Sequence, residues 1–159
     1  MRPTVKKILT LFSFILLFII GYIRESIFLV INSVLNNYPF PYNPSYIPPP
    51  EYLYSLTTQE LINLKWFFTL VFSLLFMLLS WLIIHFVFNS KTYNKIVIYI
   101  YTFFISISFL IAGIGILFNC FEILYTPSRF IVGIIQSPLL VIILFSLFFL
   151  LNQNEKMNT

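Results

Sequence analysis

Hydrophobic residues fall into four long runs, and most polar residues lie in the intervals between them. The runs cover residues 8–35, 61–88, 96–121 and 130–151. A helix rises about 1.5 Å per residue, so each run can cross about 30 Å of hydrocarbon. No run alternates polar and apolar positions as a strand does. We therefore predict an all-α membrane protein, a single domain over residues 1–159 with four transmembrane helices in an antiparallel bundle.

The longest interval, residues 36–60, contains six prolines and five tyrosines. Proline at this density disfavours helix and favours extended, polyproline-like backbone. Tyrosine suits the headgroup level of a bilayer. We expect the interval to lie along the outer membrane surface, either as an aromatic docking surface or as a linker. Thr57 and Glu60 have the spacing of a capping box, which predicts the start of the second helix.

The charged residues predict how the helices are oriented. Only 9% of the 159 residues are charged, against about 25% in soluble domains. Short cytoplasmic segments of membrane proteins carry an excess of Lys and Arg. Six of the nine basic residues lie in the two tails and in residues 89–95, and none lies in residues 36–60. We therefore predict that both termini and the 89–95 loop are cytoplasmic, with residues 36–60 and a turn at 122–129 outside.

The N-terminal segment resembles a signal peptide, because a basic stretch precedes the run that begins at Ile8. The run is long for a signal peptide, and no cleavage site of small residues follows it. We expect this segment to remain in the protein as the first transmembrane helix.

The three remaining basic residues fall at the predicted outer ends of the helices: Arg24, Lys65 and Arg129. Three acidic residues fall at the same level: Glu25, Glu60 and Glu122. We therefore predict a charged layer on the outer side. Adjacent helical residues point about 100° apart, so Arg24 is expected to pair with Glu122, and Glu25 with Arg129 or Lys65, rather than with each other. Alternatively, these side chains are only interfacial anchors that reach towards the headgroups.

The last run carries polar residues on one predicted helical face. Arg129, Gly133 and Gln136 are spaced at i, i+4 and i+7. Gln136 lies inside the membrane, where an unsatisfied amide is costly, so it requires a partner on another helix. Pro138 removes a backbone donor, which predicts a kink at Gln136–Ser137.

Small and polar residues also form stripes of the kind that allow two helices to approach closely. In the run 96–121 the stripe consists of Ser108, Ala112, Gly115 and Asn119. In the run 61–88 it consists of Thr69, Ser73 and Ser80. Helix packing is the expected role of both stripes, with Asn119 also a candidate for the outer polar layer.

The sequence offers little for catalysis. Cys120 and His85 are the sole residues of their types and fall at opposite ends of the predicted helices, too far apart to act together. No motif for a metal, a cofactor or a phosphate is present. We therefore expect no enzyme activity, no cofactor and no metal, and we expect Cys120 to be dispensable. The dispersed basic residues form no surface for nucleic acid.

Three segments together resemble a known family. They are IRESIF.VIN at residues 23–32, L.NLKWFFTLVFSLLF at residues 61–76, and LYTPSRFIVGIIQSPLLVIIL at residues 124–144. They resemble the small membrane proteins that accompany exosortases in Gram-negative bacteria. In that family an Arg and a Gln-Ser-Pro sequence lie near the outer end of the final helix, as Arg129, Gln136 and Pro138 do here. The resemblance implies an accessory subunit in the inner membrane.

The expected function is binding of a membrane protein partner, an exosortase or its sorting substrate, by a lipid-embedded, non-enzymatic protein. The predicted binding layer consists of Arg24, Glu25, Lys65, Asn119, Glu122, Arg129 and Gln136. The first alternative is a small transporter or channel subunit with the same residues at its mouth. Carboxylates confined to helix ends, loops and the tail disfavour proton-coupled export. The second alternative is a lipid-modifying enzyme that uses Arg129 and Lys65 on an anionic headgroup.

Overall fold

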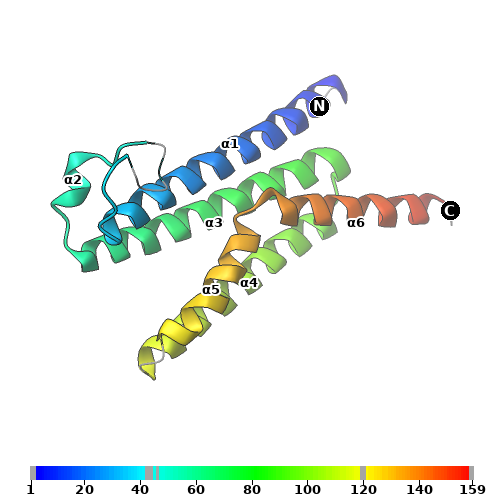
Figure 1. The fold of residues 1–159 in the computed structure, drawn as a ribbon. Coiled ribbons are helices and arrows are strands. Elements are labelled where there is room, and N and C mark those ends of the chain that lie inside the picture. The colour runs from blue at the N-terminus through cyan, green and yellow to red at the C-terminus, as the bar shows by residue number, and fades with distance from the viewer. Residues whose placement is uncertain (1–2, 42–44, 46, 119–120, 158–159) are drawn as a thin grey trace. The chain divides into compact units, whose positions relative to one another are not determined.

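The computed structural model describes residues 3–41, 45, 47–118 and 121–157, and every regular element within these ranges is a helix. The helices are α1 (Pro3–Leu35), α2 (Glu51–Tyr54), α3 (Thr58–Phe88), α4 (Lys91–Leu117), α5 (Phe121–Ile135) and α6 (Pro138–Met157) (Figure 1). Within the described ranges, α1, α3 and α4 are each long and apolar enough to cross a membrane. The pair of α5 and α6 meets the same test together, with a bend of 56°. The all-helical prediction is confirmed, and the long apolar helices fit a multi-pass membrane protein.

The connection between α3 and α4 is shorter than the predicted 89–95 loop, because it consists of two residues. Asn89 has a φ of 51°, in the left-handed region that asparagine tolerates better than most residues. Ser90 caps α4, since its side chain accepts the backbone N–H of Tyr93 at 3.4 Å. This cap starts the helix early, so Lys91 and Lys95 lie in the first turns of α4.

The structure divides into two compact units, which we call the loop unit and the long unit. The loop unit is Phe18–Phe72, and the long unit is Met1–Leu17 together with Ser73–Thr159. The continuous helices α1 and α3 each contribute residues to both units. The loop unit thus contains the whole interval between α1 and α3, and the long unit contains α4, α5 and α6.

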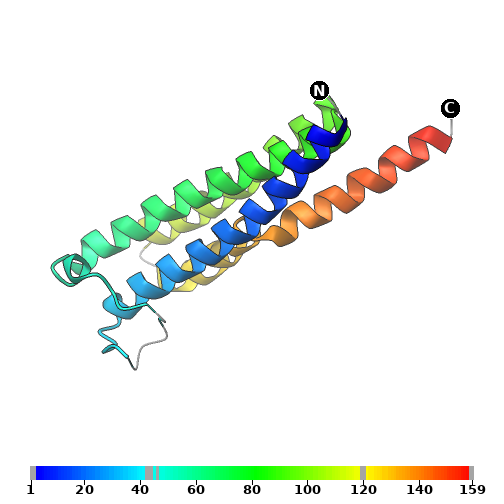
Figure 2. The ribbon, with the colours of Figure 1, turned by 90° about the horizontal axis from the view of Figure 1, so that it is seen from above.

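In the loop unit, the interval between α1 and α3 gathers where α1 ends and α3 begins (Figure 2). Leu53 of α2 is 3% exposed and packs with Ile31 and Val34 of α1 and with Leu61 of α3. Pro50 has a φ of −58° and precedes α2, a position that suits proline because the N–H it lacks has no helical partner there. The expected extended, polyproline-like backbone is therefore interrupted at α2, where burial of Leu53 stabilises a helical turn.

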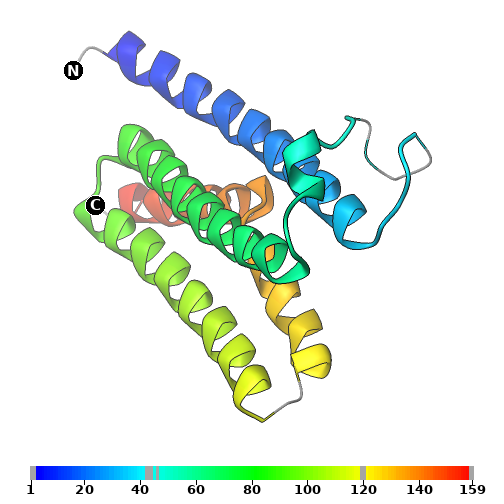
Figure 3. The same cartoon turned by 90° about the vertical axis from the view of Figure 1, so that its left-hand side faces the viewer.

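In the long unit, α4 and α5 lie side by side as a helical hairpin (Figure 3). Aromatic rings join α6 to the turn between α3 and α4. The rings of Tyr93 and Phe148 stack with their centroids 4.6 Å apart, and Phe88 contacts Phe145 at 5.6 Å. Phe145 also contacts Phe14 of α1 at 5.8 Å. These contacts between α1, α3, α4 and α6 form one end of the long unit.

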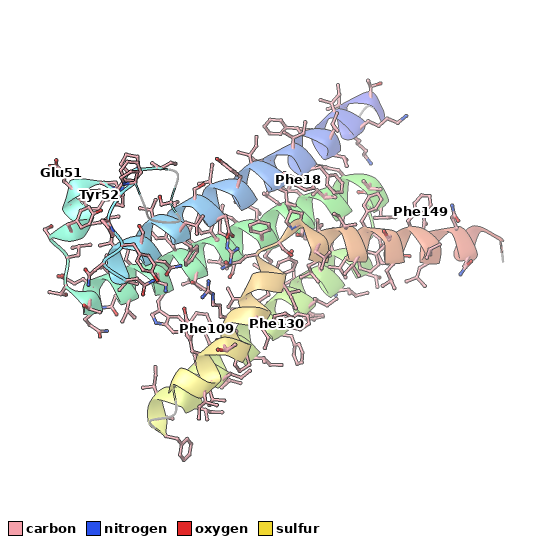
Figure 4. The ribbon with its side chains drawn as sticks, viewed as in Figure 1. Phe18, Glu51, Tyr52, Phe109, Phe130 and Phe149 are labelled. Carbon is pink, nitrogen blue, oxygen red and sulfur yellow. The ribbon has the colours of Figure 1, made fainter. Side chains whose placement is uncertain are left out.

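Phenyl groups cover much of the outside of the helices. The labelled side chains of Phe18, Phe109, Phe130 and Phe149 in Figure 4 are 55, 41, 70 and 47% exposed. Transfer of such surface from water to hydrocarbon is favourable, at about 25 cal/mol per Å². The outside of the helices therefore suits lipid rather than water.

Candidate functional site

Gln136 lies at the break between α5 and α6 and is 1% exposed. Its Nε2 donates a hydrogen bond to Oγ of Ser73 on α3, at 2.8 Å. A buried amide without such a bond would lose the free energy of its hydration. The prediction of a partner on another helix is therefore confirmed. The partner, Ser73, belongs to the stripe predicted in residues 61–88.

Pro138 begins α6, and the predicted kink at Gln136–Ser137 is confirmed by the 56° bend (Figure 1). Pro138 has no N–H to donate to the carbonyl of Ile134, as a continuous helix would require. That carbonyl instead accepts the Ser137 backbone N–H at 3.3 Å and the Ser137 hydroxyl at 2.8 Å. Ser137 thus replaces the hydrogen bond that proline removes.

Two serines hold α4 and α5 close together. Ser108 Oγ donates to the Ser128 carbonyl at 3.2 Å, and Ser128 Oγ donates to the Ser108 carbonyl at 3.0 Å. Bonds from side chain to backbone across two helices require a close approach, which small residues permit. Ala112 and Gly115 are also buried on α4. The predicted stripe is therefore a packing surface over these residues.

The turn predicted at residues 122–129 was wrong, because this segment is helical and belongs to α5. Pro127 lies inside the helix, where it costs roughly 3 kcal/mol. The hydrogen bonds of Ser128 to α4 offset part of this cost. The predicted span 130–151 is consequently two helices, and Arg129 is the ninth residue of α5 rather than its first.

Another buried pair links α3 and α4. The oxygens of Ser80 and Tyr101 lie 2.7 Å apart, and both residues are fully buried. Ser80 also donates to the carbonyl of Phe76 in its own helix, so Tyr101 donates to Ser80. The long unit therefore uses its buried hydroxyl and amide groups in bonds between helices.

Arg24 and Glu25 pair with each other, so the expectation that each would pair only with a separate neighbour was wrong. Nη1 of Arg24 lies 3.1 Å from Oε2 of Glu25. The long arginine side chain bridges the angle of about 100° between adjacent helical positions. The two side chains are 21% and 63% exposed, so the carboxylate faces outward while the guanidinium is largely covered.

Aromatic rings provide the cover for Arg24. Its Cζ lies 5.3 Å from the ring centroid of Phe28, one turn later on α1. A cation over a phenyl face is attracted to it. Phe28 in turn contacts Phe72 of α3 at 6.3 Å, and Phe72 stacks with Phe68 at 6.1 Å. These contacts explain how the loop unit accommodates an adjacent pair of charges in an apolar helix.

The start of α3 has the predicted capping box. Oε2 of Glu60 accepts the backbone N–H of Thr57 at 2.8 Å, and Oγ1 of Thr57 accepts the backbone N–H of Glu60 at 3.3 Å. Further along α3, Lys65 is half-buried, and its carbonyl accepts the hydroxyl of Thr69 at 2.8 Å. Local hydrogen bonds therefore set the first turns of this helix.

The predicted polar layer is divided between the two units. Its members in the loop unit are Arg24, Glu25 and Lys65, and its members in the long unit are Arg129 and Gln136. Glu122 lies in the first turn of α5, but its side chain is not among those that the structure describes. Asn119 and Cys120 lie outside the described residues. Each unit therefore presents a local site of its own.

The loop unit contains an apolar groove of about 260 Å³, which we call the loop groove. Ile27 and Val30 of α1 line one side, and Phe68 of α3 lines another. Leu53 and Tyr52 of α2 also line it, and the remaining lining residues are Ser26, Ile31, Ile47, Pro50 and Leu64. The groove therefore exists because α2 folds against the two long helices.

The long unit has a shallow hollow of about 460 Å³ on α5, which we call the α5 hollow. It is lined by Thr126, Arg129, Phe130, Gly133, Ile134 and Ser137. Arg129 and Gly133 share this hollow, in agreement with their predicted common face. Gln136 does not line it, because α5 ends at Ile135 and the amide bonds to Ser73.

His85 lies near the turn between α3 and α4. Its Nδ1 lies 2.9 Å from Nδ2 of Asn94, and its ring stacks with that of Trp81 at 5.3 Å between centroids. Among the described residues, no three His, Cys, Asp or Glu side chains are grouped to hold a metal ion. The contact of His85 with Asn94 joins α3 to α4.

Two residues that shape these sites were not predicted. Ser128 was assigned to a turn because it follows Pro127, yet it lies seven positions before buried Ile135, the spacing of one helical face. Leu53 is the only aliphatic residue in the segment from 48 to 54. The helical spacing between Ser128 and Ile135, and the isolated position of Leu53, were the signals in the sequence that could have predicted these two residues.

No protein-family model, no curated protein and no solved structure matches the chain. The function is therefore inferred from contacts, burial and charge within the two units.

Proposed function

We propose that this chain is a non-enzymatic accessory protein of a bacterial inner membrane that binds a membrane protein partner through the loop unit. The partner is an exosortase or the substrate that an exosortase sorts. Residues 23–32 and 61–76, which resemble companions of exosortases, include groove-lining residues of α1 and α3. Two of the three segments that carry the resemblance thus contribute to the groove, while the third, residues 124–144, lies in the long unit.

The folded interval around α2 carries the proposal. Burial of Leu53 holds α2 in place, while neighbouring large side chains remain outside. These exposed side chains are Tyr38, Phe40, Ile47, Tyr52 and Tyr54, with exposed fractions of 48, 46, 51, 65 and 54%. Glu51 and Tyr52 are labelled on α2 in Figure 4. Aromatic residues on a rigid support beside an apolar groove are typical of protein–protein interfaces.

The outward carboxylate of Glu25 adds a polar contact to this surface. Its partner Arg24 is held by Phe28, so the charge is kept at a defined position on α1. A positioned charge contributes to the choice of partner more than to total affinity. The groove would thus supply the affinity and Glu25 part of the specificity.

The proposed topology is a four-span antiparallel bundle in which α5 and α6 count as one bent span. Both termini are cytoplasmic, as the distribution of Lys and Arg indicates. The interval between α1 and α3 then lies on the outer side. There it is accessible to an outward-facing partner.

Binding is favoured over transport by the polar contacts of the long unit. Ser73, Ser108, Ser128 and Gln136 are at most 3% exposed and bond to one another across helices. A transport path needs polar groups that face water or the transported molecule. These groups instead stabilise helix packing.

The experiment is co-purification of the tagged full-length chain with a co-expressed exosortase. We expect Tyr52→Ala to weaken binding by about 30-fold, because loss of a central aromatic contact costs about 2 kcal/mol. Tyr99→Ala is the matched control, since Tyr99 is 68% exposed but lies on α4. Equal binding by both variants would remove the loop unit from the interface, and no binding by the unmodified chain would exclude this partner.

A further inference from the structure

Gly133 faces open space, although it lies within α5. Apart from its chain neighbours and the adjoining helix backbone, a Cβ atom at this position would meet no described atom within 4 Å. Glycine in a helix costs about 1 kcal/mol relative to alanine, and in membrane helices it usually allows close approach of another group. Within the long unit, no described side chain fills the space beside Gly133, so this face of α5 is left open by its own unit.

Arg129 lies one turn before Gly133 and lines the same hollow. Its side chain forms no ion pair with any other described side chain of the long unit. The long unit has only two acidic residues in its sequence, Glu122 and Glu155. Glu155 is 26 positions further along the chain, and Glu122 is seven positions earlier, about 10 Å along the helix. Within the long unit, Arg129 therefore has no described carboxylate partner, and the hollow that it lines can admit an anion.

The lining of the α5 hollow combines the groups that bind a phospholipid. The Arg129 guanidinium and the Thr126 hydroxyl lie three residues apart on one helical face, where both can donate to a phosphate. Phe130, which is 70% exposed, and Ile134 line the same hollow further into the membrane and suit acyl chains. The hollow therefore has a polar part for a headgroup and an apolar part for its tails.

The bend at Pro138 keeps Arg129 near the headgroup level. With α5 inclined at 56° to α6, each residue of α5 advances about 0.8 Å along α6 instead of about 1.5 Å. Arg129 is eight positions after Phe121, so it lies about 7 Å below that end when α6 follows the membrane normal. An arginine side chain extends far enough to reach phosphates from such a depth.

We propose that the α5 hollow binds the phosphate headgroup of an anionic phospholipid through Arg129, with the lipid lying over Gly133. The site lies in the long unit, and the proposal does not depend on the function proposed for the loop unit. Thr126 assists as a hydrogen-bond donor. A protein helix with a carboxylate is the competing occupant, but the mixed polar and apolar lining and the position near the headgroups favour the lipid.

The test is native mass spectrometry of the purified full chain in nonionic detergent with phosphatidylglycerol or phosphatidylcholine. We expect the unmodified chain to retain phosphatidylglycerol about fivefold better, the effect of one cation close to an anionic lipid. Arg129→Gln should abolish this preference. Gly133→Leu should also abolish it, because the new side chain fills the hollow without changing the charge and has room to do so.

The matched control is Lys91→Gln, which removes an exposed cation of the same unit at the start of α4 and should keep the preference. An unchanged preference in both Arg129→Gln and Gly133→Leu would overturn the proposal. Displacement of the lipid by inorganic phosphate at equal concentration would assign the site to free phosphate instead. If only the Glu122→Gln variant prefers phosphatidylglycerol, Arg129 pairs with Glu122 in the unmodified chain, and the proposal is overturned. If the unmodified chain shows no preference for phosphatidylglycerol, and Arg129→Gln releases a co-purified protein, then a protein helix occupies the hollow instead of a lipid.

Discussion

At the scale of single residues, the long unit pairs buried polar groups between helices. Gln136 with Ser73 joins the α5–α6 break to α3, and Ser108 with Ser128 joins α4 to α5. In a membrane, lipid cannot replace a lost hydrogen bond, so such pairs determine which helix faces meet. These directional bonds stabilise contacts between helices. Apolar packing alone stabilises such contacts only weakly, because apolar helix surfaces differ little from lipid.

The contact between Gln136 and Ser73 can be measured with a double-mutant cycle. We expect Gln136→Leu and Ser73→Ala each to lower the free energy of unfolding by about 1 kcal/mol. The double variant should lose about 0.6 kcal/mol less than the sum, the mean coupling of hydrogen bonds in membrane helices. Unfolding in mixed micelles of detergent and dodecyl sulfate provides the measurement.

Ser146→Ala is the control for this cycle, because the exposed Ser146 hydroxyl donates within its own helix to the carbonyl of Ile142. It should leave the free energy of unfolding nearly unchanged. Strictly additive effects of Gln136→Leu and Ser73→Ala would show that the two side chains do not stabilise each other.

At the scale of helices, two prolines of one segment have opposite effects. Pro127 is accommodated inside α5, whereas Pro138 separates α5 from α6. Ser128, directly after Pro127, bonds to α4, while Ser137, directly before Pro138, bonds to the carbonyl that Pro138 leaves free. The neighbouring contacts therefore determine whether each proline only removes a donor or ends the helix.

Pro138→Ala should reduce the bend, because alanine restores the N–H that can bond to the Ile134 carbonyl. Spin labels at the exposed positions Ile123 and Leu150, in a Cys120→Ser background, should then move further apart. Distance distributions from electron spin resonance give the readout.

Pro127→Ala is the matched control, and it should leave the distance unchanged because α5 already continues through this position. If Pro138→Ala also leaves the distance unchanged, the bend is held by the packing of Gln136 on Ser73 rather than by proline.

At the scale of the whole molecule, the charges and the loop residues act in different segments. Basic residues occur in both tails and at the start of α4, while the interval between α1 and α3 has none. That interval instead carries prolines and tyrosines, and its α2 turn rests on Leu53. In the proposed function, orientation in the membrane and recognition of a partner would therefore depend on separate parts of the chain.

The orientation can be tested with a reporter that is active only in an oxidising, external compartment. Inserted at Asn43, it should be active, because the interval has no Lys or Arg and the positive-inside rule therefore places it outside. Fused after Thr159, it should be inactive. Activity of the C-terminal fusion would contradict four spans with both termini inside.

Much of the helical architecture followed from the sequence alone. Long apolar runs predicted helices, Thr57 and Glu60 predicted a cap, and Pro138 predicted the kink. The buried amide of Gln136 required a partner before that partner was known. These features depend on a residue's own chemistry or on its near neighbours, so a single sequence contains them.

Only the tertiary structure decided three other features. Residues 122–129 are helical because Ser128 bonds to α4, and α2 forms because Leu53 is buried against α1 and α3. Arg24 pairs with Glu25 while Phe28 covers its guanidinium. The first two depend on packing with residues distant in sequence, whose stabilising free energy exceeds the local preference for turn or extended backbone. The third depends on side-chain reach, which backbone periodicity does not describe.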